Sequence, residues 1–83
     1  MSEVILKEDY DRETIMRIAS KAKTLRKELG YSYESFAMHA QINRNTYFKF
    51  EQSSTTGDNF TIGVFLKVLK GLGLTLEEFF QGL

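Results

Sequence analysis

Apolar residues recur at helical spacing in the first part of the chain, beginning just after Asp11. Asp11 can cap a helix and Gly30 can end one, because glycine adopts the left-handed conformation at little cost. Three lysines of this segment lie off the apolar stripe, as expected for a helix with one face on a core. The pattern predicts a first helix over residues 12–29, with an inward stripe of Ile15, Ile18, Ala22, Leu25 and Leu29.

Four later positions carry a side chain that can accept a hydrogen bond from the amides of a helix's first turn. Each is preceded by an apolar residue and followed by another four positions on, so the two can close over the helix start. Thr75 and Glu78 also have the spacing of a capping box. We therefore expect helices over residues 33–40, 44–52, 62–72 and 76–81, capped by Ser32, Asn43, Thr61 and Thr75.

The segments outside these helices are expected to be irregular. Polar residues 52–59 should form a loop, and Gly71 and Gly73 should end the fourth helix near Leu72. Residues 1–10 form an N-terminal arm, in which Val4–Leu6 fits a short strand, an extended segment or a frayed end. Residues 11–83 contain no repeat or linker and should form one domain. The expected inward face of the fourth helix is Ile62, Phe65, Leu66 and Leu69.

The composition favours a compact all-α bundle of about five helices. Apolar residues make up 42% of the 83 positions, too many for a disordered chain, and proline is absent. Cysteine is absent and His39 is the only histidine, so we expect no metal site and no cofactor. No nucleophile–base set is recognisable, so we expect no enzyme. No segment has the pattern of a membrane span or a signal peptide, which predicts a cytoplasmic protein without a membrane partner.

The charge is unevenly distributed although the net charge is zero. Residues 12–50 carry eight Lys or Arg and three acidic residues, a surplus of +5, whereas residues 1–11 and 51–83 carry −3 and −2. A basic surplus around the middle of the chain suits an anionic partner such as DNA. Solvated helices are often rich in lysine as well, so charge alone does not decide between the two interpretations.

Residues 32–52 predict two short helices joined by a tight turn at residues 41–43. One face of the second helix carries Thr46, Tyr47 and Phe50, which can anchor it to a core. The other face carries long polar side chains and one ring, which suit base edges and thymine methyl groups in the major groove of DNA. Taken in isolation, the same residues read as solvated charges and an ordinary exposed ring. The candidate base-reading residues are Arg44, Asn45, Phe48 and Lys49.

From Leu25 to Phe80 the sequence resembles the phage-repressor/Cro-like helix-turn-helix domain, the XRE-type family, with a lambda-repressor-like fold. The resemblance implies sequence-specific binding of double-stranded DNA, a role in transcription regulation and homodimers on palindromic operators. It rests on Leu25, Arg26, Gly30, Ser32, Glu34, Phe36, Ala37, Ile42, Asn43, Thr46, Tyr47, Glu51, Leu72, Gly73, Leu74, Leu76, Glu78 and Phe79.

The resemblance also implies roles for residues around the candidate base readers. Arg26 and Glu51 match a charged pair that ties the first helix to the end of the third. Gln41 replaces the glycine that is usual in the turn, and Tyr33 replaces the usual glutamine. The segment after the third helix is longer than usual and has no Lys or Arg, which weakens its electrostatic grip on DNA. The expected contacts to the DNA backbone are Tyr33, Thr46, Ser53, Ser54 and Thr55.

The C-terminal residues point to a partner protein. Phe79 and Phe80 are adjacent, so one helix cannot bury both against its own core; we expect Phe79 inside and Phe80 outside. Phe80 and Leu83 are then candidates for a homodimer interface. The alternative function is a protein-interaction module, such as an antitoxin whose main partner is another protein. The neutral net charge and the acidic ends of the chain favour this alternative.

Overall fold

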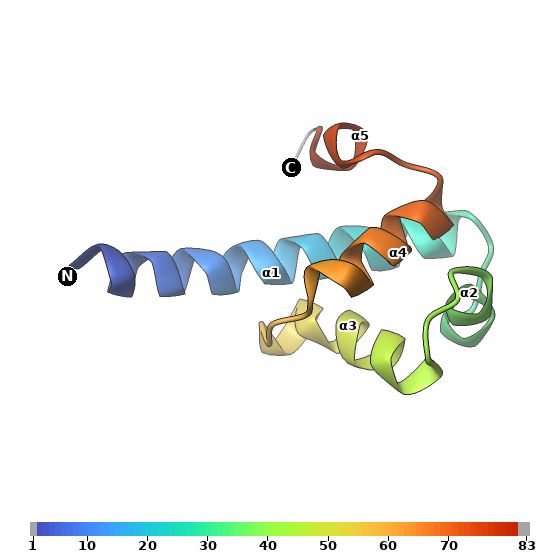
Figure 1. The fold of residues 1–83 in the computed structure, drawn as a ribbon, viewed down its shortest axis with the longest axis horizontal. Coiled ribbons are helices and arrows are strands. Elements are labelled where there is room, and N and C mark those ends of the chain that lie inside the picture. The colour runs from blue at the N-terminus through green and yellow to red at the C-terminus, as the bar shows by residue number, and fades with distance from the viewer. Residues whose placement is uncertain (1, 82–83) are drawn as a thin grey trace.

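The computed structural model describes residues 2–81, with side chains from residue 12 onward. The helices are α1 (Ser2–Glu28), α2 (Tyr33–His39), α3 (Arg44–Thr56), α4 (Ile62–Leu72) and α5 (Leu76–Phe80), and the described residues contain no strand. The predicted all-α bundle of five helices is confirmed. Helices α3 and α4 pack against α1, and α2 packs against α3. Helix α5 lies on the side of α1 and α4 that faces away from α3 (Figure 1).

The helix starts follow the capping signals of the sequence. The side chains of Ser32, Asn43, Thr61 and Thr75 all accept hydrogen bonds from first-turn amides. The Thr75–Glu78 capping box is present, and Ser32 forms a second one with Ser35. Two of the apolar pairs over these starts close, with ring centroids 5.5 Å apart for Tyr31 and Phe36 and 5.8 Å apart for Phe60 and Phe65. Local side chain–backbone chemistry therefore fixes where α2, α3, α4 and α5 begin.

The first helix begins earlier than the sequence pattern predicts. Residues 2–10 are helical and continuous with α1, so the expected strand, extended or frayed arm is wrong, and Asp11 lies inside the helix instead of capping it. These residues include several good helix formers and no Gly or Pro, so no local signal prevents the helix from extending back to Ser2. Leu29 follows the end of α1 and is 55% exposed, so it is not part of the inward stripe.

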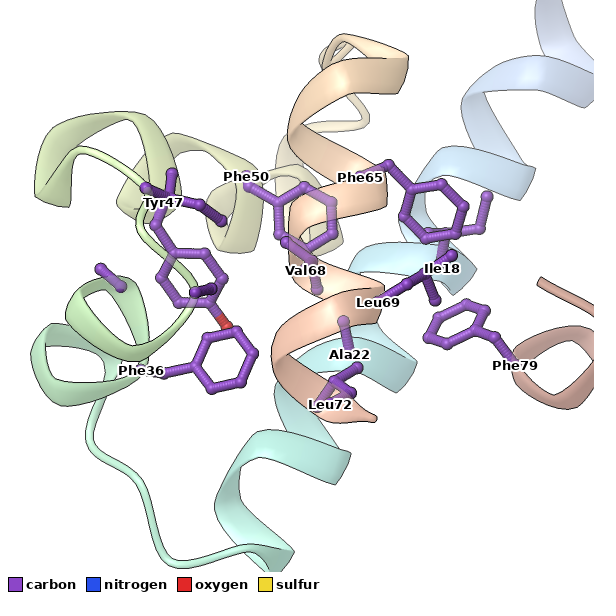
Figure 2. Close-up of a cluster of buried hydrophobic side chains, with 13 residues drawn as sticks. Ile18, Ala22, Phe36, Tyr47, Phe50, Phe65, Val68, Leu69, Leu72 and Phe79 are labelled. Atoms are coloured by element: carbon purple, nitrogen blue, oxygen red, sulfur yellow. The ribbon is translucent and has the colours of Figure 1, made fainter. Parts of the chain in front are cut away.

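An aromatic core lies between α1 and the other four helices. Phe36, Tyr47, Phe50, Phe65 and Phe79 are at most 3% exposed and surround the aliphatic side chains of α4 (Figure 2). Ala19 and Ala22 of α1 are fully buried, and their small side chains let the neighbouring helices approach α1 closely. Burial of this apolar surface is the main favourable term that holds α2 and α3 to the bundle.

Helix α4 is rotated relative to the expectation. The buried residues are Phe65, Val68, Leu69 and Leu72, whereas Ile62 and Leu66 are 66% and 47% exposed. Most positions of α4 are apolar, so the pattern itself could not select the inward face. Gly73 ends the helix with a left-handed φ of 74° as expected. Gly71, by contrast, is inside the helix, where Phe36 and Ala40 of α2 lie against it.

Two polar contacts fasten the outer helices. Lys21 of α1 donates hydrogen bonds to the backbone carbonyls of Phe79 and Gln81, and its ammonium lies 5.1 Å from the centroid of the Phe79 ring. These acceptors are at the C-terminal end of α5, where a cation is favoured. At the other end of the bundle, the His39 ring stacks on Tyr31, and its Nε2 lies 3.0 Å from the carbonyl oxygen of Gly71. Each contact fixes a short helix that has few residues of its own to bury.

Candidate nucleic-acid interface

A tight turn sets the angle between α2 and α3. Gln41 adopts a left-handed φ of 59°, which is uncommon for a residue other than glycine. The amide of Ile42 then donates to the carbonyl oxygen of Ala37 at 2.8 Å, and the Ile42 side chain is buried. Asn43 caps α3 by accepting from the amides of Asn45 and Thr46. The turn is thus closed by hydrogen bonds on both sides and anchored by one apolar side chain.

Helix α3 buries one side and exposes the other. Tyr47 and Phe50 are at most 1% exposed and hold the helix to the core (Figure 2). Thr46 was expected on that anchoring face, but it is exposed, so its assignment there is wrong. The structure brings all four candidate base-reading residues onto the exposed side: Arg44, Asn45, Phe48 and Lys49. A rigid helix that displays polar side chains in a row is a suitable shape for a DNA major groove.

Two of these four residues are held by the first turn of α2. Nη1 of Arg44 lies 2.9 Å from Oε2 of Glu34, and both side chains remain more than half exposed. The ring centroids of Phe48 and Tyr33 are 5.5 Å apart, and Phe48 is still 44% exposed. Consecutive residues of α2 therefore contact consecutive turns of α3. From the sequence, Glu34 was expected only as part of the family resemblance, because residues 34 and 44 lie on different predicted helices and no spacing rule relates them.

A buried ion pair ties α1 to α3 beneath the exposed row. Nε of Arg26 donates to Oε2 of Glu51 at 2.8 Å, and Nη2 donates to Oε1 at 2.9 Å. The remaining Nη1 donates to the carbonyl oxygen of Tyr31. Both side chains are at most 10% exposed, so the pair expected from the sequence is present and buried. Bidentate geometry and a third acceptor for Arg26 offset the cost of removing the two charges from water.

Tyr47 completes this network from within α3. Its hydroxyl donates to Oε2 of Glu51, one turn further along the helix. Burial, followed by this carboxylate, raises the pKa of Tyr47 well above that of a free tyrosine. The hydrogen bond to Glu51 is also the largest influence that raises the pKa of Arg26. At neutral pH the network therefore consists of a cation, an anion and a neutral hydroxyl, each with a partner.

The loop expected over residues 52–59 begins later than predicted, because α3 continues to Thr56 before Gly57 ends it with a φ of 72°; residues 57–59 are irregular as expected. Ser53 is 1% exposed and its hydroxyl donates to the Lys49 carbonyl, so it cannot contact a DNA phosphate as expected. Ser54 is partly buried and its hydroxyl donates to the Glu51 carbonyl. Of the three expected backbone contacts in this segment, only Thr55 is exposed.

Grooves flank the exposed row on both sides. On the side of α1, Lys23, Lys27, Gln52 and Thr55 surround the Tyr33–Phe48 pair, over a floor formed by Arg26 and Glu51. On the side of α4, Thr46 and Lys49 face Asn59 and Thr61. Lys23, Lys27, Asn59 and Thr61 were not among the predicted site residues. The two lysines are four residues apart on α1, a spacing that could have placed them on one face.

The C-terminal candidates are only partly within the described residues. Phe79 is fully buried and Phe80 is 41% exposed, which is the predicted division between the two rings. The Phe80 ring still touches the core edge, with its centroid 6.0 Å from that of Phe65. Leu83 lies outside the described residues.

Comparison with known protein families, curated proteins and solved structures finds no match to this chain. Within residues 2–81, none of the helices is both long enough and apolar enough to cross a membrane. The described side chains also include no group of three His, Cys, Asp or Glu residues that could hold a metal ion.

Proposed function

We propose that this protein binds double-stranded DNA in a sequence-specific manner and regulates transcription. The observation that carries the proposal is the row of exposed side chains on α3, which a buried aromatic face and a buried ion pair hold in one orientation. In this arrangement α3 enters the major groove. Arg44 and Lys49 offer donors to guanine, Asn45 offers paired groups to adenine, and Phe48 offers a ring to a thymine methyl group.

Backbone contacts would come from both grooves beside α3. Tyr33 and Thr55, together with the ammonium groups of Lys23 and Lys27, face one strand. Thr46 and Asn59 face the other. Lysines supply the electrostatic part of the affinity, which depends on salt, whereas hydroxyl and amide groups fix the register without adding charge. This division replaces the all-hydroxyl backbone grip that the sequence led us to expect.

The experiment that tests this proposal compares two single substitutions on a duplex selected for tight binding. Arg44→Ala should weaken binding to the selected duplex by about 10- to 100-fold and barely change binding to a scrambled duplex, because a base contact has been lost. Lys27→Ala should weaken both about equally and reduce the salt dependence by about one unit of slope. Equal losses on both duplexes for Arg44→Ala would reduce its role to a phosphate contact.

A second candidate function is the binding of another protein, and the surface of α4 and α5 favours it. Ile62, Leu66, Leu76 and Phe80 are large apolar residues between 41% and 66% exposed. Large apolar residues that gather on an exposed surface are typical of a protein-binding site. In the DNA-binding proposal this surface joins two copies into a homodimer, as expected for Phe80. In the alternative it binds a different protein, for example a toxin, and co-purification of a stoichiometric partner would favour that alternative.

A further inference from the structure

We infer that Glu34 determines sequence specificity by positioning Arg44, an inference that rests on the proposed DNA-binding function. Glu34 itself needs no base contact for this role. Its carboxylate fixes the direction in which the Arg44 guanidinium points, and its charge discourages looser binding modes. Glu34 is thus a positioning residue, and Arg44 is the residue that reads the base.

The position of Arg44 is the first reason for this inference. Arg44 is the first residue of α3, where the helix dipole disfavours a cation, and the first turn of α3 contains no acidic residue. Glu34 supplies the missing anion from the neighbouring helix, with Nη1 of Arg44 2.9 Å from its Oε2. Glu34 itself is in the first turn of α2, where an anion is favoured. The cation therefore stands at an unfavourable place with a partner from a different helix.

The geometry of the guanidinium is the second reason. Arginine presents five N–H donors in a planar fork, and the closest approach between Arg44 and Glu34 is through Nη1 of Arg44. A guanidinium approached at Nη1 can turn its Nε and Nη2 edge toward a base, and such an edge supplies the paired donors that a bidentate contact with guanine requires. Because the guanidinium is planar, fixing one nitrogen restricts the direction of this edge. An unrestrained Arg44 side chain, more than half exposed, would sample many directions and reach phosphates as easily as bases.

The charge of Glu34 is the third reason. Its side chain is 55% exposed beside the proposed DNA face, so its carboxylate repels the phosphate backbone in any complex where Arg44 no longer neutralises it. If Arg44 left Glu34 and bound a phosphate instead, the Glu34 carboxylate would repel the DNA backbone without compensation. In the sequence-specific complex Arg44 stays between the carboxylate and the base, so this repulsion is neutralised. The pair therefore penalises non-specific binding more than specific binding.

The test measures base discrimination in the full chain. Duplexes that differ by one base pair are titrated against the wild type, and the base pair read by Arg44 is identified as the one whose discrimination is lost in Arg44→Ala. Glu34→Gln should reduce discrimination at that base pair by about threefold or more. An exposed ion pair changes an equilibrium constant by up to about fivefold, and bound DNA would exclude water from the Glu34–Arg44 pair and strengthen it. Discrimination at the other base pairs should change by less than about twofold, the limit for positions outside the coupled pair.

Two controls separate positioning from general effects. Glu77→Gln removes the same charge from α5, far from the proposed face, and should leave discrimination unchanged at every base pair. In the Arg44→Ala background, Glu34→Gln should cause no further loss of discrimination, because Glu34 acts through Arg44. The exposed position of Glu34 means that the variant should fold, which thermal unfolding monitors directly.

The outcomes are distinct. A uniform loss over all base pairs, or an equal further loss in the Arg44→Ala background, would show that Glu34 acts only through its charge and would overturn the inference while leaving DNA binding intact. A wild-type protein that prefers no duplex over a scrambled one would overturn the proposed function and this inference together.

Discussion

Two glycines of α4 make a matched test of how closely α2 must approach the bundle. A methyl group added at Gly63 would find nothing nearer than the Thr61 hydroxyl oxygen at 3.9 Å. A methyl group added at Gly71 would lie 2.8 Å from Cζ of Phe36 and 2.9 Å from Cβ of Ala40. Both glycines are helical and neither has a positive φ, so the two alanine substitutions differ mainly in these contacts.

The structure gives opposite signs for the two substitutions. Alanine is favoured over glycine inside a helix by about 0.8–1 kcal/mol, so Gly63→Ala should stabilise the fold by roughly that amount or somewhat less. At Gly71 the new carbon would be about 1 Å inside the usual separation of 3.5–4.0 Å. Phe36 is fully buried and Ala40 has no flexible side chain, so α2 itself must shift. Overpacking of this kind costs about 1–3 kcal/mol, which outweighs the alanine preference and leaves Gly71→Ala destabilised by up to about 2 kcal/mol.

Thermal and urea unfolding of the two variants measure this difference. For a domain of this size about 1 kcal/mol shifts the Tm by 4–8 °C, so a difference of about 1–3 kcal/mol should separate the two Tm values by roughly 4–24 °C, with Gly63→Ala the higher. Because α2 carries Tyr33 and Glu34, Gly71→Ala should also weaken binding to the selected duplex. If both variants were stabilised equally, the close contact between α2 and α4 at Gly71 would be wrong.

Three further predictions concern the buried network and the apolar surface. Glu51→Gln should lower the free energy of unfolding by about 3 kcal/mol, because it leaves Arg26 buried without its anion. Glu13→Gln, in an exposed ion pair, should cost less than about 0.5 kcal/mol. If urea titrations gave similar losses for the two variants, the Arg26–Glu51 pair would not be buried as described. The raised pKa of Tyr47 means that above about pH 10 the unfolded chain releases a proton that the folded protein keeps, so stability should fall by up to about 1.4 kcal/mol per pH unit. Urea titrations between pH 9 and 11 should show a smaller fall of stability with pH in Tyr47→Phe than in the wild type. The same fall in both proteins would refute the raised pKa of Tyr47. Phe80→Ser should shift sedimentation toward the monomer without lowering stability by more than about 2 kcal/mol, since the ring is 41% exposed and lies at the edge of the core.

The starts of α2, α3, α4 and α5 and the four candidate base readers on the exposed side of α3 could be predicted because they depend on local rules. Capping residues such as Asn43 and Thr75 act on amides two or three positions away, so their role is visible in the sequence. The division between Phe79 and Phe80 likewise follows from helical spacing. The Arg26–Glu51 pair is not local and was expected only through a family resemblance, yet its buried geometry agrees with that expectation.

The features that sequence reasoning missed depend on contacts between helices. Ser53 was assigned to a loop because it lies in a polar run that contains Gly57, but its hydroxyl donates to a carbonyl of its own helix and its side chain is buried. Gly57 marks the true end of α3, since it adopts a positive φ just after the helix, as Gly30 does after α1 and Gly73 after α4. Helix α2 packs against Gly71, and Lys21 holds α5. Each contact joins residues more than 30 positions apart, so helical periodicity in the sequence could not predict it.

The central claim is that α3 reads a DNA sequence, and the most direct test is selection of bound duplexes from a random pool at physiological salt. We expect enrichment of an inverted repeat whose half-sites are about one helical turn apart, as two copies reading the same face of DNA require. A single enriched half-site would retain the reading role of α3 and remove the homodimer. No enrichment, with binding that vanishes as salt rises, would contradict the claim and leave the binding of another protein as the better account.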